Sequence, residues 1–237
     1  MPNDLNPSII FTDRDAAAEE LIELLPENFF EPSSTVVVGV SEGGVYFADK
    51  ISKALKAQMD ILLTEPIMAP NNSKLAIAIV SETEEVVINK VLIDAFEIDE
   101  DYVYSEANRK YEETILSYVY KYRKGVPLQS LKGKDVILAD ESIETGLTMT
   151  VALKSMIEMG AKSIYVAAPV LDFTVYDNLL SLCDGVFCPH RIRDYISIEY
   201  YYESLDKFDF ESLEKIIEAN GVTDMEKNRE KEKIPYE

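Results

Sequence analysis

Apolar residues along this chain gather in short runs that alternate with stretches of helical periodicity. The runs cover residues 36–40, 59–63, 136–139, 163–170 and 185–188. Helical spacing predicts helices over 12–25, 45–55, 99–124, 148–160, 173–182 and 210–219. Strands that are apolar on both faces are typical of parallel sheets covered on both sides. The alternation therefore predicts an α/β fold with a doubly wound, mostly parallel sheet flanked by helices.

Three segments depart from this alternation. Residues 65–72 contain prolines and asparagines and predict a loop. Residues 75–80 and 86–88 predict neighbouring strands joined by an acidic turn. From residue 220 the chain is dense in charge and poor in apolar residues, which predicts a solvated or disordered tail. We expect one domain over 1–219 and a charged tail over 220–237.

One segment combines features that suit phosphate and sugar. After the run that ends at residue 139 come two carboxylates, Asp140 and Glu141, then a short turn and the helix start Thr145-Gly146-Leu147-Thr148. The free N–H groups of a first helical turn attract a phosphate, and a glycine there lets the backbone come close. Two carboxylates beside it can hold sugar hydroxyls or the waters of Mg²⁺. Ligands of doubly wound sheets bind at this carboxyl edge.

Composition and charge narrow the possible partners. The 237 residues include 44 acidic and 23 basic side chains, a net charge of −21, and 47% are hydrophobic. Such a charge disfavours nucleic acid on an open surface. It does not exclude a small phosphorylated ligand held by backbone N–H groups and a metal ion. No apolar run could span a membrane, and residues 1–4 do not open a signal peptide, so we expect a cytoplasmic protein with no membrane partner.

Two further features have alternative interpretations. The predicted helix over 99–124 ends in a basic, tyrosine-rich stretch that includes Arg123. This stretch either contacts nucleic acid or, more commonly, forms a solvated face with its tyrosines lying on the domain. The two cysteines, Cys183 and Cys188, with the single histidine, His190, lack a metal-binding pattern and predict reduced thiols.

The run Asp-Glu-x-x-x-Thr-Gly-x-Thr at 140–148 resembles the phosphoribosyl-pyrophosphate (PRPP) motif of type I phosphoribosyltransferases. Four further motifs carry the resemblance over about residues 11–218: Phe11-x-Asp13-Arg14-x-x-Ala17, Val38-Gly39-x-x-x-Gly43-Gly44-Val45, Ala69-Pro70-x-Asn72 and Ala167-x-Pro169-Val170. The resemblance implies the type I phosphoribosyltransferase fold, with a flap or hood segment over about 66–130. It also implies Mg²⁺ as cofactor, and PRPP and a nucleobase, purine-like favoured, as partners. The oligomeric state stays undetermined, with a homodimer as one alternative.

The same resemblance implies roles for individual residues. Asp140 and Glu141 would hold the ribose hydroxyls and stabilise a cationic sugar as pyrophosphate leaves. The 5-phosphate would bind Thr145, Gly146, Leu147 and Thr148. The turn Ser41, Glu42, Gly43 and Gly44 would meet the pyrophosphate. Mg²⁺ would bridge pyrophosphate and ribose through water, with no side chain as its direct ligand.

Glutamates stand at three places where they affect this interpretation. Glu144 is either a proton acceptor near the purine N7 or a solvent-facing loop acid. The resemblance implies cations where Glu42 and Glu65-Pro66 stand, because the leaving group is a polyanion. Such acids weaken the case for PRPP-dependent turnover.

Three hypotheses follow. The first is a Mg²⁺-dependent transferase that moves a 5-phosphoribosyl group between PRPP and a nucleobase. The second is a degenerate, non-catalytic member that binds a nucleotide or phosphate in a regulatory role, which Glu42 and Glu65 favour. The third is a receiver-like phosphoryl-transfer domain that uses Asp140. The third needs a basic residue at a neighbouring strand end, and the sequence offers none.

Overall fold

The computed structural model describes residues 9–208 and 210–223. Our predictions for residues 1–4 and for 224–237 of the tail lie outside these ranges. Residues 220 and 222, which follow the predicted end of the domain at residue 219, pack on the domain. The side-chain amide of Asn220 donates to Asp49 Oδ1 at 2.8 Å, and Val222 is buried. The packed structure therefore continues past residue 219.

A five-stranded parallel sheet forms the centre of the molecule, in the order β10-β8-β6-β1-β2. The strands are β1 (Thr35–Gly39), β2 (Gln58–Ile61), β6 (Asp135–Ala139), β8 (Ser163–Ala167) and β10 (Gly185–Phe187). The chain adds β2 on one side of β1 and then β6, β8 and β10 on the other. This confirms the predicted doubly wound α/β fold and places its switch point between β1 and β6.

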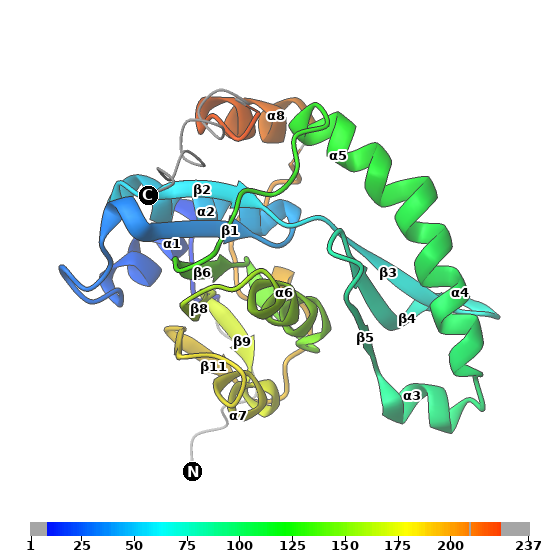
Figure 1. Ribbon diagram of the computed structural model, residues 1–237. Helices are drawn as coiled ribbons and strands as arrows, with labels where there is room; N and C mark the ends of the chain where they lie inside the picture. The colour runs from blue at the N-terminus through cyan, green and yellow to red at the C-terminus, as the bar shows by residue number, and fades with distance from the viewer. Residues whose placement is uncertain (1–8, 209, 224–237) are drawn as a thin grey trace, which may run out of the picture.

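Alternate residues of each central strand enter different hydrophobic cores. Val37 and Ile137 pack with helices α1 (Arg14–Glu23) and α2 (Glu42–Leu55), whereas Val38 and Leu138 pack with α6 (Leu147–Glu158). Figure 1 shows α6 on one side of the sheet and α1 and α2 on the other. The strands are apolar throughout because both of their faces are covered.

A second unit, which we call the hood (residues 64–123), follows β2. It contains an antiparallel sheet of β3 (Thr64–Ala69), β4 (Asn72–Ser81) and β5 (Val86–Ile88), then α3 (Lys90–Ala95). A long helix follows as α4 (Glu100–Lys110), a π-helical turn (Tyr111–Ile115) and α5 (Leu116–Arg123). It confirms the predicted helix over 99–124, with Asp99 as its N-cap. Figure 1 shows this helix running along the outer side of the hood sheet.

The predicted loop over 65–72 was wrong. Residues 65–69 belong to β3, and only the turn that follows is irregular. Pro66 is compatible with a strand here because β3 pairs with β4 alone and is the edge of its sheet. The helix α3 was also not predicted, because its six residues are too few to show a period.

The hood packs against α6 of the core. Ile79 and Val87 of its sheet pack against Leu147 and Val151 of α6. Beside them Ser155 Oγ lies 2.7 Å from Thr83 Oγ1 and 3.0 Å from Ser81 Oγ.

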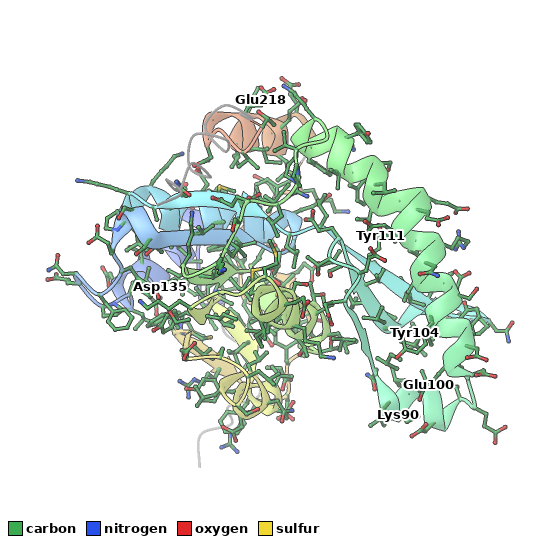
Figure 2. The ribbon with its side chains drawn as sticks, in the orientation of Figure 1. Lys90, Glu100, Tyr104, Tyr111, Asp135 and Glu218 are labelled. Atoms are coloured by element: carbon green, nitrogen blue, oxygen red, sulfur yellow. The ribbon has the colours of Figure 1, made fainter. Side chains whose placement is uncertain are left out.

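At its far end, Lys124 Nζ lies 2.7 Å from Glu218 Oε1 of α8 (Phe210–Ala219), which Figure 2 shows beside the end of the long helix. Tyr104 and Tyr111 line a cavity between this helix and the hood sheet together with Val80 and Val86. Tyr118 and Tyr122 pack against the hydrophobic core, as we expected, whereas Tyr120 is 72% exposed. Arg123, which we had placed on a solvated face, is instead fully buried.

The region after β8 also differs from the prediction. The predicted strand 163–170 breaks at residues 168–169, and β9 (Val170–Asp172) joins β7 (Ser142–Ile143) and β11 (His190–Ile192) in a small parallel sheet. The predicted helix 173–182 is a 3₁₀ turn (Phe173–Val175) followed by α7 (Tyr176–Leu180). Within the described residues no helix has the length and apolarity needed to cross a membrane.

Candidate active site

The loops after β1 and β6 meet at the switch point of the sheet. Ser41 is the N-cap of α2 and accepts a hydrogen bond from Gly44 N at 2.8 Å. The same hydroxyl donates to Asp140 Oδ1, which also accepts from Glu141 N at 2.8 Å. No described residue hydrogen-bonds the second oxygen, Oδ2. The structure thus brings together two predicted site segments that lie 99 residues apart in the chain.

Burial controls the charge of Asp140. The residue is 8% exposed. Burial raises the pKa of this carboxyl to about 7 from its ordinary value of 3.8, against the hydrogen bonds from Ser41 and Glu141 N, which lower it. Near neutral pH the group is therefore poised between its two protonation states.

Glu141 has a cationic partner that was not among our predicted site residues. Arg14, the first residue of α1, donates through Nε to Glu141 Oε1, and its Nη1 donates to the backbone oxygen of Asp206. Its guanidinium also lies 4.2 Å from the centre of the Phe208 ring. The sequence could have indicated this residue, because Arg14 lies within the motif from Phe11 to Ala17 that carries the resemblance. Arg14 holds the second carboxylate and balances its charge.

Two glycines allow this close approach of α2 to β6. A Cβ on Gly43 would lie 2.4 Å from Glu141 Oε2, and a Cβ on Gly44 would lie 2.5 Å from the backbone oxygen of Ala139. Neither position tolerates a side chain without movement of the site. Gly43 and Gly44 therefore act by bringing the turn and the two carboxylates together.

We expect Gly44→Ala to destabilise the protein by about 1–3 kcal/mol, because the obstacle is backbone that cannot rotate away. The gain in helix propensity, up to about 1 kcal/mol, opposes this only in part. Gly43→Ala should cost a similar amount, because its Cβ would lie 2.6 Å from Glu141 Cβ, which cannot rotate away. Urea denaturation of both variants measures the losses, and a stability equal to that of the wild type in either variant would contradict its close contact.

The segment 145–148 opens α6 as predicted. Gly146 is the N-cap with φ 72°, a left-handed conformation that suits glycine. The N–H of Leu147 has only a long contact, 3.5 Å, to Thr145 Oγ1. The N–H groups of Thr148 and Met149 have no acceptor among the described residues. These amides are therefore available to an anion.

The remaining predicted residues lie at the rim of the site. Glu144 is exposed and hydrogen-bonds to no described residue. The nearby phenol of Tyr195 has its pKa raised to about 12, first by burial and, in smaller part, by Glu144. Glu42, in the first turn of α2, is exposed and lines a cavity of about 230 Å³ together with Glu65.

Metal-binding side chains are few in the structure. Within the described ranges no three or more His, Cys, Asp or Glu residues are grouped so that they could hold a metal ion. Asp140 and Glu141 are a pair, and Arg14 already binds one of them. This donor set fits a cation held through water and a ligand's own oxygens better than a resident ion.

Comparisons with known proteins agree with this fold. The family model of the phosphoribosyl transferase domain matches residues 10–203. A Mycobacterium tuberculosis protein named only provisionally as a phosphoribosyl transferase is 25% identical over 179 residues, which are 76% of this chain and 40% of that protein. The chain thus spans less than half the length of the curated relatives it matches.

A solved structure is also similar over most of the chain. The protein TT1426 from Thermus thermophilus has 28% sequence identity and a TM-score of 0.72. The match covers 88% of this chain and 97% of the Thermus protein. The likeness therefore includes the hood as well as the central sheet.

Proposed function

Because this chain belongs to the phosphoribosyl transferase domain family, we propose that it is a Mg²⁺-dependent transferase that moves a 5-phosphoribosyl group between PRPP and a nucleobase, purine-like favoured. The observation that carries the proposal is the contact between Ser41 and Asp140 beside the open start of α6. It places an acid pair, a turn and free amides at one edge of the sheet, where doubly wound folds bind ligands.

The 5-phosphate binds at the start of α6. The N–H groups of Leu147, Thr148 and Met149 lie at the N-terminal end of this helix, where the helix dipole favours negative charge. The hydroxyls of Thr145 and Thr148 add donors, and Gly146 keeps the entrance free of a side chain. The protein's net charge of −21 does not prevent this, because the amides act at short range in a local site.

Asp140 and Glu141 act on the ribose. Their carboxylates accept hydrogen bonds from the 2- and 3-hydroxyls and stabilise the positive charge that develops on the sugar as pyrophosphate leaves. Asp140 must be ionised to do so, and a nearby cation favours that form. When bound, Mg²⁺ supplies positive charge that neutralises pyrophosphate, and the free oxygen of Asp140 can accept from its waters. Glu144, at the rim, is the proton acceptor for a bound base.

A second function, ligand binding without turnover, is favoured by one specific observation. Glu42 stands in the turn that would meet pyrophosphate, and no described residue balances its charge. Pyrophosphate release from PRPP with a panel of purine and pyrimidine bases separates the two functions. Release with one base supports the transferase, whereas PRPP binding without release from any base supports the binding protein.

The phosphate placement predicts a loss of affinity in the double variant Thr145→Ala with Thr148→Ala. Two lost hydrogen bonds of about 0.5–1.5 kcal/mol each should weaken binding of PRPP or a 5′-nucleotide about 5- to 150-fold. Titration calorimetry measures this. Thr114→Ala, in the π-helical turn of the hood, is the matched control and should bind like the wild type. Unchanged affinity in the double variant would place the phosphate elsewhere.

A further inference from the structure

A cavity of about 230 Å³ lies beside the turn Ser41 to Gly44. The ends of β1 and β2 form its floor, and α5 of the hood and α8 form its walls. Figure 1 shows α5 and α8 meeting above the β2 side of the sheet. The volume lies below the ~300–1,000 Å³ typical of pockets for drug-sized ligands. The cavity therefore suits a compact ligand next to the ribose site.

The charged groups of this cavity are all acidic. Glu42 and Glu65 line it, and its lining contains no Lys, Arg or His. Lys110, outside the lining, lies with Nζ 3.0 Å from Glu65 Oε2 and balances that one carboxylate. The Glu42 carboxylate has no partner among the described residues. A pyrophosphate here would face uncompensated negative charge, whereas a cation would be attracted.

Two aromatic rings complete the lining. Tyr118 and Tyr122 lie one turn apart on α5, with ring centroids 5.9 Å apart. Burial raises the pKa of both phenols, and the neighbouring Glu65 adds to this at Tyr118 and Glu42 at Tyr122. The remaining walls are mostly aliphatic, from the strand ends and α8. Aromatic faces with carboxylates are the combination that binds organic cations.

We propose that this cavity binds a cationic substituent, an amidine or aminomethyl group, carried on the ring of the nitrogen-bearing co-substrate, and that it does not hold pyrophosphate. The cationic group donates to Glu42 and Glu65 while the ring lies against Tyr118 and Tyr122, and the reacting nitrogen is a different, neutral nitrogen of the co-substrate. The aliphatic walls favour such a ligand over Mg²⁺, which retains its waters and needs several oxygen ligands. The role as co-substrate site rests on the proposed function; the charge preference of the cavity does not.

Two probes of the same shape and opposite charge test the inference. Benzamidine and benzoate are titrated separately into the full chain by calorimetry. We expect saturable binding of benzamidine and none of benzoate. Loss of charge-assisted hydrogen bonds in Glu42→Gln with Glu65→Gln should weaken benzamidine binding about tenfold or more. Glu112→Gln, an exposed acid on the same long helix, is the matched control and should bind benzamidine like the wild type.

The inference is overturned if benzamidine does not bind saturably, or if the double glutamine variant keeps wild-type affinity. It is equally overturned if benzoate or inorganic pyrophosphate binds as tightly, or if Mg²⁺ alone displaces benzamidine. A parallel titration with PRPP separates the two proposals. Glutamate-dependent benzamidine binding without PRPP binding contradicts the proposed function alone. PRPP binding that requires Thr145 and Thr148, without benzamidine binding, contradicts the cation site alone.

Discussion

Replacing Arg123 with methionine is expected to lower the free energy of unfolding by about 3–5 kcal/mol, because it leaves two buried carboxylates without their counter-charge. Arg123 is fully buried at the end of α5. Its Nη2 donates to Glu82, and its Nη1 lies 3.8 Å from Asp60 Oδ1. Backbone N–H groups complete the cluster, from Leu63 to Glu82 at 2.9 Å and from Gln129 to Asp60 at 3.1 Å.

The pH dependence of the loss identifies its cause. Burial raises the pKa of both Asp60 and Glu82, and Arg123 opposes this. Without Arg123 the two pKa values rise further. A carboxyl whose pKa is raised in the folded state costs stability as pH rises from its unfolded pKa through its folded pKa. The deficit of Arg123→Met should therefore be small in acid, where both groups are protonated, and largest at neutral pH.

Urea denaturation at a series of pH values measures this effect. Arg109→Met, on the exposed face of the same helix, is the matched control, because its ion pairs with Glu106 and Glu113 are solvated and contribute about 1 kcal/mol or less. Adding Asp60→Asn and Glu82→Gln to Arg123→Met should recover part of the stability. A deficit that is the same at every pH would show that packing, not charge, is the function of Arg123.

Replacing Asp140 with asparagine is expected to stabilise the ligand-free protein and to weaken PRPP binding. The folded pKa of about 7 exceeds the ordinary 3.8 by about 3 units, each worth about 1.36 kcal/mol. The wild type thus loses up to about 4 kcal/mol as pH rises from about 4 to about 7, and no more above that. The amide has no such ionisation, yet its oxygen can still accept from Ser41. The gain in the free energy of unfolding of Asp140→Asn over the wild type should be absent near pH 4 and complete near pH 8.

The same substitution removes the negative charge that the proposed reaction needs. Losing charge-assisted bonds of about 1.5–3 kcal/mol should weaken PRPP binding by roughly 10- to 150-fold. Stability and affinity are measured on one preparation by denaturation and calorimetry. Asp135→Asn, at the opposite end of β6 (Figure 2), is the control and should leave PRPP affinity unchanged. An Asp140 variant that is less stable at pH 8 than the wild type would contradict the burial argument.

Much of the central fold could be predicted from periodicity. The parallel strands were apolar throughout because helices cover both faces, so their positions could be read directly. β7 and β11 were missed because each contains a polar residue, Ser142 in β7 and His190 and Arg191 in β11, and so forms no apolar run. β3 was missed because a proline such as Pro66 usually indicates a loop. It is compatible with a strand at the edge of a sheet, and only the fold shows that β3 is such a strand.

The sequence by itself determined the succession of the five central strands and their helices, the position of a helix start at 145–148, and the acids that precede it, because these depend on neighbouring residues. Only the tertiary structure decided which distant residues meet. Arg14 reaches Glu141 across 127 positions, and Ser41 reaches Asp140 across 99. Burial likewise depends on the whole fold. It raises the pKa of Asp140. Arg123, which looked like a surface cation in the sequence, is buried, because solvent access depends on what packs around a side chain.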